Sequence, residues 1–109
     1  MNELALLGDE AVALGALHAG VSASYGYPGT PSTEILEWLI AEYEAGGPLA
    51  AWTSNEKTAM EAALGVSFAG KRTLVTMKHV GLNVAADPFV NSALLKIKGG
   101  VVIAVADDP

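Results

Sequence analysis

The sequence has no cysteine among its 109 residues, which removes several kinds of chemistry at once. Disulfide bonds, thiolate metal sites, iron–sulfur ligation and cysteine nucleophiles are all excluded within this chain. Aromatic residues are scarce, at 6%, and six basic residues stand against twelve acidic ones. The resulting net charge of −6 argues against a nucleic-acid partner, since a phosphate backbone calls for a basic surface.

Small and aliphatic residues are abundant instead. Hydrophobic residues make up 51% of the sequence and charged residues 17%, so long disordered tails are not expected. No stretch is long and apolar enough to cross a bilayer, and the first residues lack the basic start of a secretory signal. We therefore expect a cytoplasmic chain with no membrane partner, of a length that suits one domain or one piece of a larger one.

Helical and strand-like segments alternate along the chain. Helices are predicted over 9–19, from 31 to the Gly-Gly-Pro turn at 46–48, from Ser54 or Asn55 to about Ala69, and from Asn83 or Pro88 to Lys96. Strands are predicted over 21–27, 49–53, 73–77 and 101–105, the last being the most clearly buried in pattern. This order predicts an α/β domain over residues 1–109, with a parallel sheet covered by helices on both faces. No helix follows the last strand to cover it, so we expect a fold incomplete at its C-terminus, a fragment or a subunit completed by a partner.

Three polar segments follow predicted strands, at 27–31, 53–56 and 78–83. Ligands of parallel sheets bind at the carboxyl ends of the strands, so these segments are expected to meet at one edge. Their convergence predicts a binding site more strongly than any one of them does.

The first of these segments, Tyr-Pro-Gly-Thr-Pro, is a rigid turn that leads into a helix. Gly29 permits close approach by a ligand, and Thr30 places a hydroxyl near unpaired helix N–H groups that could bind a carboxylate. Alternatively Thr30 caps the helix, which the residue types favour, and the two roles are compatible. The segment lacks the Gly-Lys-Ser/Thr ending of a phosphate-binding P-loop.

Glu56 and His79 each allow a structural and a functional interpretation. A first-turn Glu stabilises the helix dipole, which the sequence alone favours, whereas one facing a cleft could take a functional protonation state. His79 and Asn83 form a polar cluster in a glycine-containing loop, suited to local hydrogen bonding or to substrate contact. No metal site is expected, because the other histidine, His18, lies far along the chain in another helix.

Read together, four segments resemble the start of the alpha subunits of the indolepyruvate:ferredoxin oxidoreductases. They are Gly-Tyr-Pro-Gly-Thr-Pro-Ser at 26–32, Ser-Asn-Glu-Lys at 54–57, Thr-Met-Lys-His-Val-Gly-Leu-Asn at 76–83 and Val-Ala-Asp-Asp-Pro at 105–109. These enzymes belong to the thiamine-diphosphate-dependent 2-oxoacid:ferredoxin oxidoreductases. The Tyr-Pro-x-Thr-Pro motif is shared across that superfamily, whereas the Lys-His-Val-Gly-Leu-Asn stretch is specific to the indolepyruvate branch.

The resemblance implies a pyrimidine-binding domain of a thiamine enzyme. Glu56 matches the family Glu that hydrogen-bonds the aminopyrimidine ring, where a carboxyl sharing its proton with the ring promotes loss of the proton from the thiazolium C2. Gly29 falls in the cofactor-binding turn, and Thr30 matches the family Thr beside the substrate's carboxylate and keto group. His79 and Asn83 are expected to face the arylpyruvate side chain.

The family's full alpha subunit also carries parts that this sequence lacks. A second thiamine domain holds the diphosphate through Mg²⁺, and a cysteine-rich segment holds iron–sulfur clusters. We therefore expect thiamine diphosphate to be shared with a domain outside this chain, and Mg²⁺ and the clusters to lie only in those missing parts. The implied partners are the diphosphate-binding domain, a second subunit, ferredoxin and coenzyme A.

The implied function is oxidative decarboxylation of arylpyruvates to acyl-CoA, with ferredoxin as electron acceptor, in an assembly of which this chain is one part. The isolated chain is expected to be inactive. Two alternatives stay open: a non-catalytic interaction module from a truncated or split gene, and a different thiamine-dependent 2-oxoacid decarboxylase. The segment at 78–83 argues against the second of these.

Overall fold

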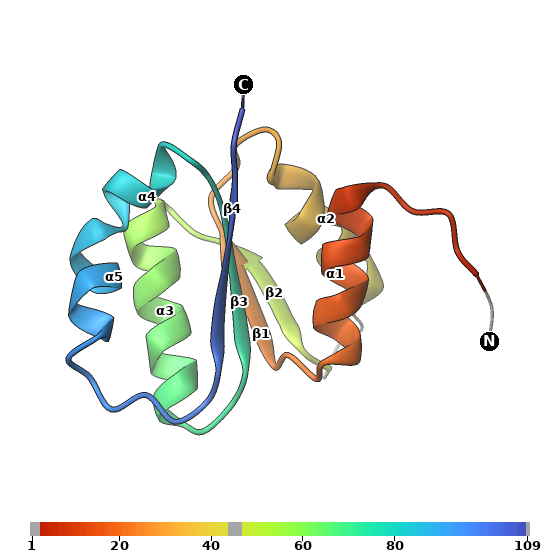
Figure 1. Cartoon of the computed structure of the whole chain (residues 1–109). Coiled ribbons are helices and arrows are strands. Elements are labelled where there is room, and N and C mark those ends of the chain that lie inside the picture. The colour runs from red at the N-terminus through yellow and green to blue at the C-terminus, as the bar shows by residue number, and fades with distance from the viewer. Residues whose placement is uncertain (1–2, 44–46, 109) are drawn as a thin grey trace.

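Four parallel strands in the order β2-β1-β3-β4 form the centre of the molecule (Figure 1). The computed structural model describes residues 3–43 and 47–108. The strands are β1 (Ala23–Gly26), β2 (Leu49–Trp52), β3 (Thr73–Lys78) and β4 (Val101–Ala106). The predicted α/β class and the parallel sheet are therefore confirmed. The end of the predicted second helix at 44–46, and residue 109 of the last motif, lie outside the described residues.

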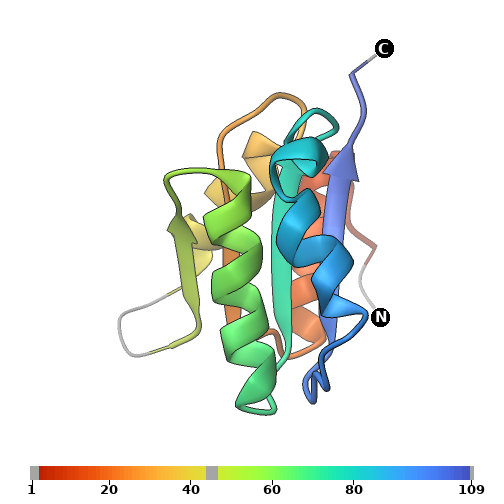
Figure 2. The ribbon, with the colours of Figure 1, turned by 90° about the vertical axis from the view of Figure 1, so that its left-hand side faces the viewer.

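Helices cover both faces of the sheet, as the sequence predicts. Figure 1 shows α1 (Gly8–His18) and α2 (Thr33–Glu42) on one side and α3 (Glu56–Phe68), α4 (Gly81–Val84) and α5 (Ala86–Ser92) on the other. Side chains alternate along each strand, so Leu74 packs toward α1 and α2 whereas Val75 and Met77 pack toward α3. Figure 2 shows α3 and α5 side by side on one face of the sheet, with β2 and β4 at opposite edges of the sheet.

The bounds of α1 and α3 follow from local sequence signals. The side chain of Asn55 caps α3 by accepting a hydrogen bond from the backbone N–H of Thr58 at 2.8 Å, as one of the two predicted caps. Just beyond the two helices lie Gly20 and Gly70, whose φ angles of 75° and 84° few other residues adopt. Small buried residues such as Ala59 and Ala63 let α3 pack closely on the sheet.

The prediction that 101–105 is the most buried strand is wrong. β4 pairs with β3, and among the described residues no strand pairs with its other edge. Val102 is 63% exposed, and it lines an apolar hollow of about 230 Å³ together with Val12 and Gly15 of α1. The apolar run of β4 therefore reflects an edge strand that is partly open to solvent in this chain.

The predicted fourth helix differs from the observed one. Helical structure begins earlier, at Gly81, is interrupted at Ala85, and ends at Ser92 instead of Lys96. Pro88 explains the interruption, because it has no N–H to donate to the carbonyl of Val84 and its ring crowds that carbonyl. In the first turn of a new helix, α5, the same proline is tolerated.

Within residues 3–43 and 47–108, no helix is long and apolar enough to cross a membrane.

The loop that leads into β4 is tied to the C-terminal end of α3. The buried Ser67 hydroxyl donates to the carbonyl of Gly99, and the N–H of Gly99 donates to the carbonyl of Ser67 at 2.9 Å. Gly99 also lies directly against backbone, because a Cβ added to it would stand 2.6 Å from the nitrogen of Lys71. Close approach of two backbone segments thus requires glycine at this position.

Two neighbouring glycines provide a test of this close approach. Gly99→Ala should lower the free energy of unfolding by roughly 1–3 kcal/mol, because backbone must move to admit the methyl group. Gly100→Ala is the matched control, since a Cβ there meets nothing within 4 Å. Urea denaturation of the chain would measure both, and equal effects of the two variants would contradict the packing described here.

Candidate functional site

The three polar segments meet at one end of the sheet, where the carboxyl ends of the strands lie (Figure 1). In the strand register, Gly26 at the end of β1 pairs with Trp52 of β2 and Thr76 of β3. The loops that follow therefore leave the sheet at nearly the same level, which confirms the predicted convergence of these segments.

Glu56 is the first residue of α3 and is buried, with 9% of its surface exposed. Negative charge is favourable at this position because unpaired backbone N–H groups point out of the helix. Among the described residues, no hydrogen bond or ion pair joins the Glu56 carboxyl. The structure thus presents a nearly buried carboxyl group with free hydrogen-bonding capacity beside the loop after β3.

The loop after β1 lies directly over the end of β3. A Cβ added to Gly29 would stand 2.9 Å from Cβ of Lys78, so a side chain at position 29 would push the two segments apart. Beyond this contact, the Lys78 ammonium group lies 3.3 Å from Asp108, which links β3 to the chain after β4. Both side chains are partly exposed, so this ion pair contributes little to stability.

Thr30 does not cap α2, and this prediction is wrong. The N-terminal cap position is Ser32, and the hydroxyl of Thr33 accepts the N–H of Gly29 at 2.8 Å. The Ser32 hydroxyl donates to the carbonyl of Gly29 at 2.7 Å. Thr30 is exposed and, with Glu34 and the first turn of α1, lines an open cleft of about 390 Å³. Among the described residues its hydroxyl has no hydrogen bond, so it is free for a ligand.

His79 and Asn83 are placed differently from each other. The half-buried His79 is hydrogen-bonded to the end of β4 and to the residue that lies two positions beyond it. The backbone N–H of His79 donates to the carbonyl of Ala106 at 3.0 Å, and its ring Nδ1 accepts the backbone N–H of Asp108 at 3.4 Å. This arrangement leaves Nε2 available for another partner. Asn83 lies exposed in α4, and no described hydrogen bond holds its side chain.

Three acidic residues that sequence reasoning did not select line the cleft beside Thr30, namely Asp9, Glu10 and Glu34. Asp9 and Glu34 stand in the first turns of α1 and α2. Burial raises the pKa of Asp9 above its ordinary value of 3.8, and the charge of Glu34 raises it further. First-turn acids are common at helix starts, so nothing in the sequence distinguished this pair from ordinary dipole-stabilising residues.

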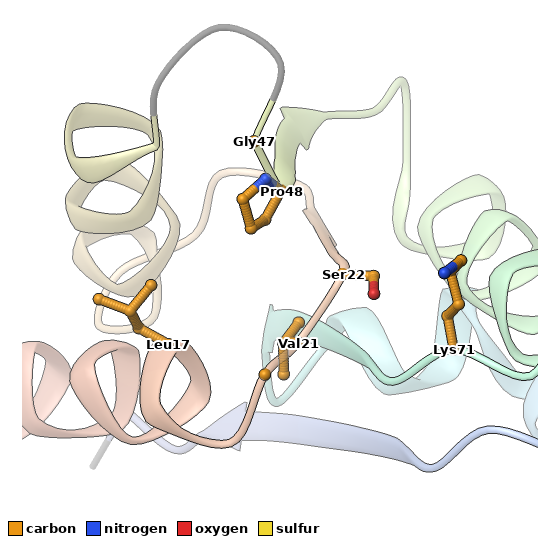
Figure 3. A pocket seen from close by; sticks show the side chains of 7 residues that line it. Leu17, Val21, Ser22, Gly47, Pro48 and Lys71 are labelled. Carbon is orange, nitrogen blue, oxygen red and sulfur yellow. The ribbon is translucent and has the colours of Figure 1, made fainter.

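A second hollow, of about 400 Å³, lies at the opposite end of the sheet, where the strands begin (Figure 3). Val21, Ser22, Pro48 and Lys71 border it from the segments that lead into β1, β2 and β3. None of the residues predicted to be functional lies there. Within the part of the chain that the structure describes, no group of three or more His, Asp or Glu side chains could hold a metal ion.

Comparison with known proteins identifies the family. A family model described as "Pyruvate flavodoxin/ferredoxin oxidoreductase, thiamine diP-bdg" matches residues 14–94. The chain belongs to this family. The match spans β1, β2, β3 and the three loops of the candidate site, so the resemblance noted from the sequence motifs is confirmed.

Curated relatives within the pyruvate flavodoxin/ferredoxin oxidoreductase family are much longer than this chain. The chain is 47% identical over 104 residues to indolepyruvate oxidoreductase subunit IorA of Thermococcus kodakarensis, covering 95% of itself and 16% of that protein. It is 48% identical over 108 residues to the IorA subunit of Archaeoglobus fulgidus, covering 95% of itself and 17% of that protein. The ketoisovalerate oxidoreductase subunit VorB of Methanothermobacter thermautotrophicus is more distant, at 30% identity over 76 residues, 70% of this chain and 22% of its own length.

A solved structure of a 2-oxoacid:ferredoxin oxidoreductase shares the fold. It is the 2-oxoglutarate:ferredoxin oxidoreductase of Magnetococcus marinus, with 2-oxoglutarate, coenzyme A and succinyl-CoA bound. The TM-score is 0.82 at 26% identity, over 95% of this chain and 18% of that one. The parallel sheet described here therefore corresponds to one part of a larger oxidoreductase chain.

The coupling of Asp9 to Glu34 can be tested by titration. A raised carboxyl pKa means that the folded state holds the proton more firmly than the unfolded state, so this contribution to stability is full below pH 3.8 and is lost as pH rises through the folded pKa. In Glu34→Gln, the pKa of Asp9 measured by NMR should fall yet stay above 3.8, because burial, the larger cause, remains. Glu37→Gln, an exposed change one turn along α2, should leave it in place. Equal titration curves for all three proteins would show that Glu34 does not act on Asp9.

Proposed function

We propose that this chain forms the pyrimidine-binding part of a thiamine-diphosphate-dependent oxidoreductase that decarboxylates arylpyruvates to acyl-CoA. One observation carries the proposal: Glu56 presents a nearly buried carboxyl group, free of described partners, at the carboxyl edge of a parallel sheet. A helix-stabilising Glu needs no burial, because the helix dipole acts equally on an exposed carboxylate. A group that must share a proton with a cofactor ring benefits from being shielded from water.

The residues present fit the pyrimidine half of thiamine diphosphate. The Glu56 carboxyl can accept a hydrogen bond from a cofactor amine or, when protonated, donate one to a ring nitrogen. Gly29 lets the loop after β1 lie directly on Lys78, which keeps that loop close to the end of β3. When bound, the cofactor supplies the carbon that attacks the 2-oxo group and the sink for the electrons that decarboxylation releases. Glu56 would hold a proton at its carboxyl oxygen and exchange it with the cofactor there.

Thr30, His79 and Asn83 are proposed to contact the substrate. The free hydroxyl of Thr30 can donate to a carboxylate or keto oxygen, and the free Nε2 of His79 can donate to or accept from a polar group. Asn83 lies two residues beyond Gly81 and offers an amide at the rim of the same edge. These three residues come from the loops after β1 and β3, and the segment at 78–83 also contains Gly81, which lies against the Glu56 side chain.

The proposed substrate and partners rest on the named relatives. Two relatives at 47% and 48% identity are indolepyruvate oxidoreductase subunits, which supports an arylpyruvate substrate. The solved relative is a 2-oxoacid:ferredoxin oxidoreductase with coenzyme A bound, which supports coenzyme A as acyl acceptor and ferredoxin as electron acceptor. Since this chain spans 16–18% of these proteins, we assign Mg²⁺, the iron–sulfur clusters and the diphosphate-binding domain to other parts of the assembly. A second subunit and a cytoplasmic location complete the proposal.

The role of Glu56 predicts a loss of turnover without a loss of fold. In the assembled oxidoreductase, Glu56→Gln should lower 2-oxoacid decarboxylation at least 100-fold, a size usual for removal of a general acid–base group. Glu61→Gln is the matched control, because this exposed carboxyl lies on the same helix and the change removes the same charge. If Glu56 served only the helix dipole, both the activity and the assembly of Glu56→Gln would stay near wild type, with roughly 0.3–1 kcal/mol of stability lost.

The role of Thr30 predicts a separation of kinetics from stability. Thr30→Val keeps the shape and removes the hydroxyl, so turnover should fall roughly tenfold or more for a lost hydrogen bond to a charged substrate group of about 1.5–3 kcal/mol. The melting temperature should not change, since the hydroxyl has no described partner. Thr33→Val should lower the melting temperature and leave turnover in the folded protein unchanged, because it removes the hydroxyl that accepts the N–H of Gly29. A melting curve and a kinetic assay on each variant distinguish these outcomes, and unchanged kinetics in Thr30→Val would exclude its role.

A further inference from the structure

Gly81 stands directly against the carboxyl group of Glu56. A Cβ added to Gly81 would lie 2.6 Å from Cγ and 2.8 Å from Cδ of Glu56, with Oε2 nearer still. Carbon atoms in normal contact lie about 3.5–4.0 Å apart, so no side chain fits at this position beside the present carboxyl. The three nearest heavy atoms all belong to the side chain of Glu56, and none to the backbone.

The backbone around Gly81 has little freedom to retreat. On one side, the N–H of His79 is bonded to the carbonyl of Ala106 at 3.0 Å, which ties the loop to the end of β4. On the other side, the N–H of Ala85 is bonded to the carbonyl of Gly81 at 3.0 Å, and Ala85 is fully buried in the core beneath α3. Gly81 itself is buried between these two anchors.

The backbone of Glu56 is held as firmly. Asn55 caps the helix at its start, and one turn further along Ala59 and Met60 are buried in the sheet-facing core. The Glu56 side chain beyond Cβ is the one flexible part of this contact, because its χ angles can move to another staggered position at small cost. A side chain at position 81 would therefore displace the Glu56 carboxyl and leave both backbones in place.

We propose that Gly81 is a positioning residue, whose missing side chain leaves open the place that the Glu56 carboxyl occupies at the carboxyl ends of the strands. This inference rests on the proposed role of Glu56. The Glu56 carboxyl occupies the space that a Cβ at position 81 would fill, and no described polar partner competes for its proton there. Gly81 thus determines the position of the proton-sharing group while making no contact with substrate.

The test compares two glycine variants in the assembled oxidoreductase. Gly81→Ala should lower kcat at least tenfold and weaken thiamine diphosphate binding, measured by calorimetry, at least fivefold, while KM for the 2-oxoacid changes less than twofold. Gly65→Ala is the control, because it makes the same change in the exposed part of α3, where a Cβ meets nothing within 4 Å. It should leave all three quantities within twofold of wild type.

A double-variant comparison separates positioning from a general structural effect. Glu56→Asp withdraws the carboxyl by one methylene and relieves the collision, so adding Gly81→Ala to it should cost less than a further twofold in kcat. If Gly81→Ala alone fails to assemble, the pair Glu56→Ala with Gly81→Ala should recover assembly. Equal losses from Gly81→Ala in both Glu56 backgrounds, or an assembly defect that Glu56→Ala does not repair, would overturn the inference.

The outcome for Glu56→Gln keeps this inference distinct from the proposed function. Turnover of Glu56→Gln near wild type would overturn the function, whatever Gly81→Ala does. A slow Glu56→Gln combined with normal kcat and normal cofactor affinity in Gly81→Ala would retain the function and overturn the positioning role alone.

Discussion

Parallel pairing of β1, β2 and β3 is the constraint on which the candidate site depends. Gly26 is in register with both Trp52 and Thr76, so the loops after β1 and β2 begin at one level of the sheet and the loop after β3 begins two residues beyond it. Residues as far apart in sequence as Gly29 and Lys78 thereby come into direct contact. Ligand sites at the carboxyl ends of parallel strands arise in this way, because successive crossovers return every strand in the same direction.

Close approach within the site is achieved by omitting side chains. Gly29 lies on Cβ of Lys78, and Gly81 lies on the Glu56 carboxyl. Each glycine stands where a larger residue would separate two of the loops or move a functional group. The same device appears away from the site, where Gly99 permits the loop before β4 to lie on the backbone of Lys71. The small residues of this sequence therefore determine distances between segments as well as the packing of α3.

The errors made from sequence arise because residue type and local pattern do not show which neighbours a residue meets after folding. Thr30, Ser32 and Thr33 are neighbouring hydroxyl residues at a helix start, and any of them could satisfy a turn, so residue type could not decide which one is free. The structure gives the loop hydrogen bonds to Ser32 and Thr33 and leaves Thr30 exposed. In β4 the apolar pattern indicated a strand correctly, but burial depends on a neighbour beyond its free edge. Pro88 was read as a possible helix start, and the structure uses it in the first turn of α5.

The sequence by itself determined the alternation of helices and strands, the parallel sheet, a cap at Ser54 or Asn55 and the end of the sheet at which the polar segments meet. These follow from periodicity, capping residues and the direction of parallel crossovers, all of which are local or topological. Only the tertiary structure decided that Glu56 is buried, that the hydroxyl of Thr30 is free and that the charge of Glu34 raises the pKa of Asp9. It also decided that Gly81 leaves space for the Glu56 carboxyl. Burial and contact depend on which surfaces meet after folding, and residues 25 positions apart, such as Glu56 and Gly81, carry no local sign that they will touch.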